Sequence, residues 1–334
     1  MIGPPRAMGG SHPSRDASAI GSRRMGIASP YSSAMAQGPP ARRSIPPTFD
    51  RVAVRRLFAR AGDGDPAFAR VMQDARDALL DRLDGIRIAP RRILDLGAGT
   101  GALARCLARR FRGVEVVSVD PVPGLLHSAR ERGPRWLSRH RHVAGEAERL
   151  PLATHCADLI VSSVAMPWFD PVDDALHECL RALRPGGLLL LSTLGSGTLK
   201  ELAVAWADVG GPPRMHPFAD MHVLGDALVH AGFADVVMDV QRIRLKAPGF
   251  WPLCRILSRS GGSGALAARR RGLTAVETFR AAEARYHTLR DADGALPVSV
   301  ELVFGHAWAP EGDRPGASAV LPRMDWSVRS KPRA

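Results

Sequence analysis

The chain has 334 residues, of which 45% are hydrophobic and 24% are charged, and its mean hydropathy is −0.08. These values are ordinary for a soluble globular protein of one large or two small domains. No apolar run approaches the ~20 residues that a membrane-spanning helix needs, so the sequence predicts no membrane contact.

The formal net charge is +13, and arginine supplies nearly all of the positive charge. GC-biased coding explains a general arginine excess, and a basic face for an acidic partner is the alternative. Aromatic residues make up only 5% and no basic stripe is interleaved with them, so nucleic acid is not expected as a partner. The cysteines show no C-x-x-C pair, which predicts thiols of a reducing compartment and no metal site. They are Cys106, Cys156, Cys179 and Cys254.

Residues 1–45 are rich in Gly, Pro, Ser, Ala and Arg and carry a single acid, Asp16. This composition predicts a disordered basic extension. Abundant Arg and Ser with few acids is also typical of a transit peptide, while the lack of an apolar core argues against a secretory signal. An overextended start is a third interpretation, with Met25 or Met35 as alternative first residues.

Two helices are predicted before the first strand. Residues 48–60 form a basic amphipathic helix, which the Gly- and Asp-rich segment 62–66 interrupts. A second helix over residues 67–83 places Val71, Ala75 and Leu79 on one face.

The stretch from Arg91 to Leu103 carries the most specific signal. An apolar run containing Asp95 precedes three glycines, Gly97, Gly99 and Gly101, and a helical pattern follows. This order predicts a buried strand, a tight turn and a helix start. Glycine permits positive φ and close approach of a ligand to the backbone, and the new helix is expected to add unpaired N–H groups.

The spacing of the glycines narrows the choice of ligand class. No Gly-Lys-Ser/Thr follows, so the turn is not a phosphate-binding loop. The order is G-x-G-x-G, which differs from the G-x-G-x-x-G of dinucleotide sites. Taken alone, the motif is also compatible with an ordinary strand-to-helix turn.

A second acid lies at the end of the next strand. Residues 114–119 are a short β-branched run that ends at Asp120, about 20 residues beyond the glycines, where an acid can accept both ribose hydroxyls. The alternative is a plain turn residue before Pro121.

Four elements in order resemble the class I S-adenosylmethionine-dependent methyltransferases: the glycine stretch, Gly145-Glu-Ala-Glu-Arg-Leu-Pro151, the strand Ala157–Ser163, and Arg184-Pro-Gly-Gly187 before an apolar run. The resemblance implies S-adenosylmethionine as the cofactor. It further implies that Glu146 receives the adenine amine beside the Ala147 backbone, and that Ser162 lies over the methyl donor. The implied cofactor site is Asp95, Gly97, Gly99, Gly101, Asp120, Glu146, Ala147 and Ser162.

The expected architecture is α/β: a Rossmann-like methyltransferase fold with a mainly parallel seven-stranded sheet and helices on both faces. After the first four strands, the patterns predict a helix at 172–183, a strand at 188–193, helices at 198–207 and 220–231, a strand at 233–243, a helical insert at about 249–290, and a closing edge strand at 298–307. The methyltransferase domain is expected over residues 46–309, and a flexible tail over 310–334.

The second half resembles a narrower family, the malonyl-acyl-carrier-protein O-methyltransferases of biotin synthesis. The similar stretches are Phe49–Arg60, Ser192–Leu202, Phe218–Phe233 and Ala284–Pro297, within residues 47–310. This resemblance implies methylation of the free carboxylate of malonyl carrier protein, which starts the pimeloyl chain. It also implies an acidic acyl carrier protein as partner. We further expect a bacterial cytoplasmic location and a monomer.

A malonyl carboxylate is ionised at neutral pH, so no general base and no catalytic side chain are expected. The site instead needs alignment, exclusion of water and a cation for the acceptor. The resemblance points to Arg255 as that cation and to Trp168 as a wall of the acceptor pocket; a solvated helix arginine and a core tryptophan are the alternatives. Structural roles are expected for His142, His216, His222, His230 and His306.

Three segments depart from the narrower family's pattern, all on the acceptor side. No Tyr occurs in Ala61–Asp65, where the family often has one. Ser162–Trp168 and Gly261–Gly264 also differ from the usual sequences. The alternatives are therefore a methyltransferase for another small acid or a quinone-like acceptor, a non-methylating protein like the mitochondrial complex I assembly factors, one kind of which is a protein hydroxylase, or an inactive scaffold. A mitochondrial matrix location goes with the assembly-factor alternative.

Overall fold

The computed structural model describes most of the compact unit Ile45–Ala334. The described residues are 49–61, 64–133, 139–207, 209, 214–261, 265–267 and 272–312. The predictions for residues 1–45, and for the tail beyond residue 312, lie outside this part of the chain. The domain limits drawn from the sequence therefore stay a prediction.

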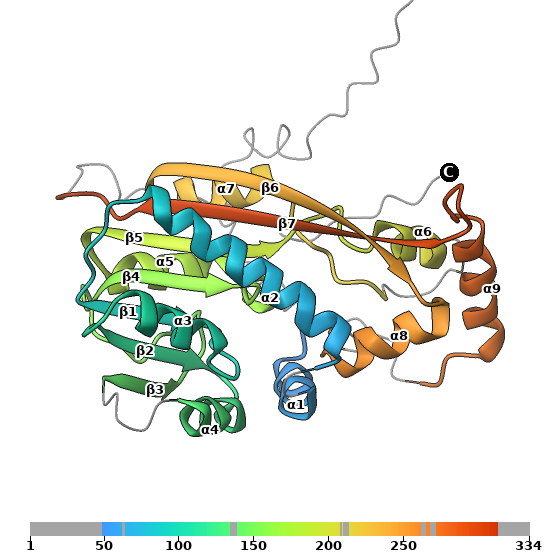
Figure 1. The fold of residues 1–334 in the computed structure, drawn as a ribbon, viewed down its shortest axis with the longest axis horizontal. Coiled ribbons are helices and arrows are strands. Elements are labelled where there is room, and N and C mark those ends of the chain that lie inside the picture. The colour runs from blue at the N-terminus through green and yellow to red at the C-terminus, as the bar shows by residue number, and fades with distance from the viewer. Residues whose placement is uncertain are drawn as a thin grey trace, which may run out of the picture. The chain divides into compact units, whose positions relative to one another are not determined.

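A single seven-stranded sheet organises the described residues (Figure 1), in the order β3-β2-β1-β4-β5-β7-β6. Strands β1 to β5 are parallel, and β7 runs antiparallel to both β5 and β6. The mainly parallel sheet predicted from the sequence is confirmed. The strands are β1 (Arg92–Leu96), β2 (Glu115–Asp120), β3 (His140–Ala144), β4 (Ala157–Ser163), β5 (Leu183–Leu194), β6 (Ala234–Ala247) and β7 (Leu296–Trp308).

Helices connect β1 to β2, β2 to β3 and β4 to β5, as parallel strands require, whereas the described segment between β3 and β4 contains no helix. The helices are α1 (Arg51–Ala61), α2 (Pro66–Asp81), α3 (Ala102–Arg110), α4 (Pro123–Arg132), α5 (Val172–Ala182), α6 (Lys200–Ala207), α7 (Met221–His230), α8 (Phe250–Arg259) and α9 (Val276–His287), with short 3-10 turns η2 (Arg82–Gly85) and η3 (Met166–Trp168). Local chemistry fixes some of these ends. At α2 the Asp65 side chain accepts a hydrogen bond from the Ala67 N–H at 3.1 Å, and Pro66 occupies the first turn, where its missing N–H costs nothing.

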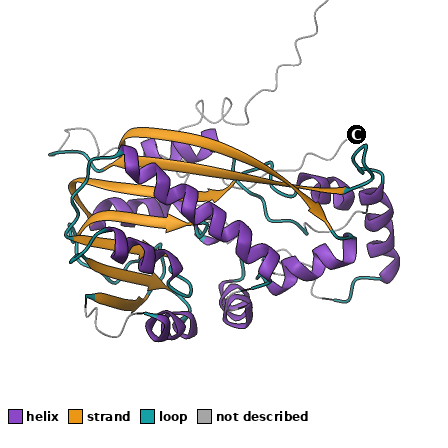
Figure 2. Cartoon of the chain, in the orientation of Figure 1, coloured by secondary structure: helices purple, strands orange, loops and turns teal. Residues whose placement is uncertain are grey.

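Both faces of the sheet are buried by helices (Figure 2). Neighbouring residues of β1 show the alternation, because Ile93 packs in the cluster with α2 and α3 while Leu94 packs in the cluster with α5 and α7. The prediction of helices on both faces is confirmed. Among the described helices, none has the length and apolar character needed to cross a membrane.

Two expectations about strands are wrong. β7 is not an edge strand: it pairs with β5 on one side and β6 on the other, and β6 forms the edge. The burial patterns give the reason, since β7 is buried along most of its length while β6 alternates. The strand expected at 188–193, after the Arg184–Gly187 turn, is also wrong in its start. β5 begins at Leu183 and includes that turn, where Gly186 has φ +72° and Arg184 forms an ion pair with Asp158.

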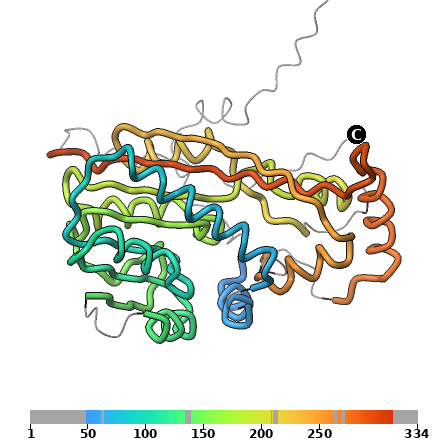
Figure 3. Tube along the Cα trace, viewed as in Figure 1, coloured from blue at the N-terminus to red at the C-terminus, as the bar shows by residue number. Residues whose placement is uncertain are grey.

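The insert between β6 and β7 contains α8 and α9, and it lies at the far end of the long β6–β7 pair (Figure 3). Ring contacts join α9 to α6 and α8: Trp206 meets Phe279 at 5.2 Å and Phe250 meets Tyr286 at 6.1 Å. The C-terminal end of α8 also meets the loop after α1, because the Asp65 N–H donates to Ser260 Oγ at 3.4 Å. The insert is therefore tied to the N-terminal helix.

Candidate functional site: a glycine loop and two strand-end acids

The three glycines after β1 have different structural roles. All have positive φ, of 73° at Gly97, 52° at Gly99 and 75° at Gly101. A Cβ at Gly97 would lie 2.1 Å from the Ala165 methyl, and one at Gly101 would lie 2.8 Å from the Ala129 methyl. A Cβ at Gly99 would meet no atom of the described residues within 4 Å. The first and third glycines allow close packing, whereas the second presents open backbone to a ligand.

Backbone hydrogen bonds hold the loop against β2. The Gly97 and Ala98 N–H groups both donate to the Val119 carbonyl, at 2.8 and 3.1 Å. The Gly99 N–H donates to Asp120 Oδ2 at 2.9 Å, and the Ala104 N–H of α3 donates to Asp95 Oδ2 at 3.0 Å. The expectation of unpaired N–H groups at the start of α3 is wrong for Ala104, because Asp95 accepts its N–H. The N–H groups of the loop residues Gly97, Ala98 and Gly99 are paired as well. A ligand would meet the acids and bare backbone.

Asp120 lies at the carboxyl end of β2 and is 6% exposed. Besides the Gly99 contact, its Oδ1 accepts the Val122 N–H at 2.8 Å. Burial raises its pKa, the two backbone N–H donors oppose that shift, and nearby Glu146 adds to it. Each carboxylate oxygen has two lone pairs, so both can still accept a ligand hydroxyl.

Asp95 is 1% exposed beneath the same loop. Burial raises its pKa to about 7; the Ala104 N–H lowers it, and the negative charge of Asp120 raises it further. A buried acid at the end of a central strand, next to a second acid, is costly unless a cation satisfies it. The pair of acids therefore favours a positively charged ligand.

A cavity of about 560 Å³ begins beside Asp120. Its lining joins the turns after β2 and β3 to α1, and the residues are Arg55, Arg56, Ala59, Pro121, Val122, Pro123, Gly124, Ala144, Gly145 and Glu146. Glu146 lines this cavity and forms an ion pair with Arg55. Sequence reasoning missed the α1 residues here, because an amphipathic pattern does not say what a helix covers.

The remaining predicted cofactor residues are buried beside the loop. The Ser162 hydroxyl donates to the Leu96 carbonyl at 2.9 Å, which ties β4 to the residue before Gly97. Ala147 is buried in the hydrophobic core beneath the cavity turn. These contacts suit residues that position the loop, and direct contact with a cofactor stays a prediction for both.

Trp168, in η3 after β4, lies at the centre of an aromatic cluster. Its ring centroid is 5.3 Å from Phe49, 5.1 Å from Phe58 on α1 and 5.3 Å from His216. The His216 Nε2 donates to the Pro167 carbonyl at 2.7 Å, and burial lowers the pKa of His216 to about 4. The ring is thus neutral near pH 7, in keeping with a structural role. The cluster joins α1 to the segment that follows β4.

Arg255 is exposed on α8, and the structure gives it no contact with Trp168 among the described residues. Phe58 links the two regions, because Gly261 after α8 packs against the ring that also contacts Trp168. Trp168 is therefore brought to the end of β4 with α1, whereas Arg255 belongs to the insert beside it.

Comparisons with known proteins agree with this geometry. A methyltransferase domain family matches residues 94–191. A malonyl-acyl-carrier-protein O-methyltransferase of Halorhodospira halophila is 39% identical over 266 residues, which cover 79% of this chain and 90% of the relative. The enzyme of the same name from a Methylovorus species is 38% identical over 291 residues, covering 86% and 96%.

The chain belongs to the malonyl-acyl-carrier-protein O-methyltransferase family. It is an S-adenosylmethionine-dependent methyltransferase. Its fold is also similar to the solved YcgJ protein of Bacillus subtilis, with a TM-score of 0.51 and 16% identity over 71% of this chain and 99% of that one. This likeness concerns the fold alone.

The residues of this family member fit S-adenosylmethionine. The cofactor presents two ribose hydroxyls, an adenine amine and a cationic amino-acid end. Asp120 offers acceptors at a strand end, Glu146 offers one in the cavity, and Asp95 is an acid buried behind the glycine loop, where its Oδ2 accepts the Ala104 N–H. These groups come from three separate strand ends that the parallel sheet brings to one edge.

Proposed function

We propose that this enzyme transfers a methyl group from S-adenosylmethionine to the free carboxylate of malonyl-acyl carrier protein, the step that starts the pimeloyl chain of biotin. The length of the match carries the proposal. The Halorhodospira and Methylovorus relatives of this name are similar over 266 and 291 residues, far beyond the methyltransferase domain at residues 94–191. The similarity must therefore include a large part of the chain after residue 191, where the insert with Arg255 lies.

When bound, S-adenosylmethionine supplies an electrophilic methyl group on a sulfonium. A malonyl carboxylate is an ionised nucleophile at neutral pH, so the protein need not remove a proton. Asp95 and Asp120 hold the donor's charged and hydroxyl groups, and the loop from Gly97 to Gly101 fixes its position. The contribution of these residues is alignment, which can supply several kcal/mol of rate enhancement.

The residues that bind the methyl acceptor are proposed from their chemical character. The aromatic cluster around Trp168 excludes water from the end of β4, and Arg255 is the cation proposed to hold the acceptor carboxylate after a movement of the exposed side chain. His216 is no alternative cation, because its pKa is lowered to about 4 by burial. The proposed partner is an acidic acyl carrier protein, and the proposed location is the bacterial cytoplasm.

The test is incubation of the protein with methyl-labelled S-adenosylmethionine and malonyl-acyl carrier protein. A base-labile methyl ester on the carrier protein is expected. Acetyl-acyl carrier protein, which lacks the free carboxylate, is the matched control and should stay unlabelled. If the protein binds S-adenosylmethionine but labels neither carrier protein, the acceptor assignment is overturned.

A further inference from the structure

Two helices beside the site are basic throughout. α1 (RVAVRRLFARA) and α8 (FWPLCRILSR) together contain six arginines and no acidic residue. The two helices lie next to each other, because the segment after α1 meets the end of α8. The Asp65 N–H donates to Ser260 Oγ, and Gly261 packs against the Phe58 ring.

The arginines of α1 divide into two groups. Arg51 donates to the Asp170 carbonyl and lies 3.6 Å from Glu148, and Arg55 pairs with Glu146 in the cavity. These contacts hold α1 against the segments that follow β3 and β4, next to the cavity. Arg56 and Arg60 are exposed, and neither has an ion-pair partner among the described residues.

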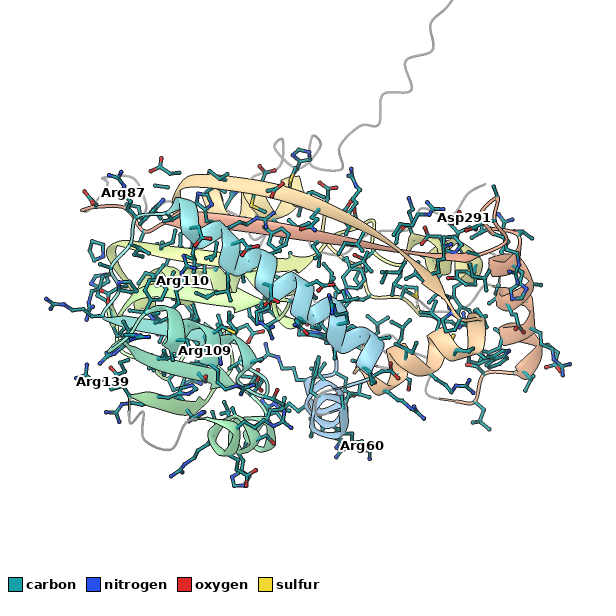
Figure 4. The ribbon with its side chains drawn as sticks, viewed as in Figure 1. Arg60, Arg87, Arg109, Arg110, Arg139 and Asp291 are labelled. Carbon is teal, nitrogen blue, oxygen red and sulfur yellow. The ribbon has the colours of Figure 1, made fainter. Side chains whose placement is uncertain are left out.

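The arginines of α8 behave like the second group. Arg255 and Arg259 are exposed, again with no ion-pair partner in the described part of the chain. We call the four side chains Arg56, Arg60, Arg255 and Arg259 the basic corner. Figure 4 shows Arg60 directed away from the protein, and Arg87 far from it beyond the other end of α2.

Helix stability does not account for the basic corner. Arg60 and Arg259 lie in the last turns of their helices, where a cation interacts favourably with the helix dipole. Arg56 and Arg255 lie one turn earlier, and each forms a like-charged i,i+4 pair with the arginine that follows. Such pairs are destabilising by roughly 0.2–0.5 kcal/mol each. A surface that keeps this repulsion is suited to an anionic partner.

We propose that the basic corner is the docking surface for the acidic carrier protein that brings the acceptor. The inference rests on the proposed function and adds the face of the enzyme that the partner meets. α1 carries half of the basic corner and also lines the cavity next to Asp120 through Arg55. Its Phe58 contacts Trp168, the proposed wall of the acceptor pocket. A carrier protein docked on α1 and α8 can therefore direct its flexible prosthetic arm past Phe58 to the end of β4.

A protein partner fits this corner better than other anionic surfaces. The two helices have 11 and 10 residues and present paired cations at their ends, which is complementary to a compact acidic protein. A membrane would require a broad apolar face between the cations, and among the described residues of the two helices only Val52 on α1 and Trp251 on α8 are exposed large hydrophobic residues.

The experiment compares two double variants. Arg60→Glu with Arg259→Glu replaces two of the four positive charges of the corner by negative ones and so cancels its net charge, without touching Arg255 or the cavity residue Arg56. Arg87→Glu with Arg91→Glu changes the same charge at exposed positions before β1 and is the control. The first readout is binding of unloaded acyl carrier protein in its phosphopantetheinyl form. The second is kcat/KM with malonyl-acyl carrier protein and with malonyl-pantetheine, which has no protein body.

The corner variant should bind the carrier protein at least ~10-fold more weakly and lose kcat/KM on malonyl-acyl carrier protein by a similar factor. Its activity on malonyl-pantetheine should match the wild type, which also shows that it folds. Raising the salt concentration should weaken carrier binding of the wild type and leave the corner variant nearly unaffected. The control double variant should behave as the wild type.

The docking proposal is overturned if the wild type does not bind the carrier protein, if the two double variants bind it equally, or if the corner variant loses the same factor on both thioesters. An unfolded corner variant is replaced by Arg60→Gln with Arg259→Gln, to which the same criteria apply. Carrier binding that depends on the corner, without methyl transfer to any malonyl thioester, would contradict the proposed function and leave the docking surface standing.

Discussion

The Asp120 carboxylate at the end of β2 accepts a hydrogen bond from the backbone N–H of Gly99, 21 residues earlier, at 2.9 Å. This carboxylate thus shapes the glycine loop, and we propose that it also accepts the hydroxyls of the cofactor ribose. Asp120→Ala should weaken binding of S-adenosylmethionine by ~1–3 kcal/mol, since the loop and the ribose both lose an acceptor. Isothermal titration with S-adenosylhomocysteine measures this. An unchanged affinity would remove Asp120 from the site.

The glycines allow packing and ligand approach to be separated. Gly97→Ala brings a methyl 2.1 Å from the Ala165 methyl at φ +73°, and should lower the free energy of unfolding by more than ~2 kcal/mol. Gly99→Ala meets no described atom within 4 Å, so only the backbone strain of ~1–2 kcal/mol is expected. Its cofactor affinity should nevertheless fall strongly. Urea unfolding and cofactor titration together check the pair; equal stability losses would contradict this division.

The buried Asp95 makes stability depend on pH. Burial raises its pKa from 3.8 to about 7, so the native state holds this proton more tightly than the unfolded chain does. The free energy of unfolding should then fall as the pH rises through this window. Without cofactor, Asp95→Asn should be more stable than the wild type by at least ~1 kcal/mol at pH 8, and the difference should shrink at pH 5.

Urea unfolding at the two pH values is the measurement, and Asp77→Asn, at a half-exposed side chain on α2, is the matched control. The Asp95→Asn variant should also bind S-adenosylmethionine more weakly, because it lacks the negative charge. A stability difference that is the same at pH 5 and pH 8 would show that Asp95 does not titrate in this range.

The ion pair between Arg55 and Glu146 closes α1 over the cavity. Both side chains are partly exposed, so Arg55→Ala should change the free energy of unfolding by less than ~1 kcal/mol. Its KM for S-adenosylmethionine should rise roughly fivefold with little change in kcat, because Glu146 loses the partner that orients it. Arg70→Ala removes another exposed ion pair, with Asp74 on α2, and serves as the control. Steady-state kinetics in which both variants behave alike would argue against a positioning role.

Much of the donor site follows from the sequence. The run from Asp95 to Gly101 identifies strand, turn and helix because glycine spacing and apolar periodicity act over a few residues. The strand that ends at Asp120 is found in the same way. The bounds predicted for β4, Ala157–Ser163, match the structure because a short apolar run between polar residues leaves little choice of where the strand begins and ends.

Other features depend on contacts between distant residues. β7 has the pattern of an edge strand, yet β6 takes the edge, because strand order depends on which surfaces are left to bury. The sequence alone identified the glycine loop and its two acids, and the resemblance of four elements in order to the class I methyltransferases supplied the donor class. Only the tertiary structure decided that α1 covers the cavity through Arg55 and Glu146, 91 residues apart, and that α1 meets α8. Local propensity acts over only a few residues. Contacts between distant residues form only once the sheet has brought its strand ends together.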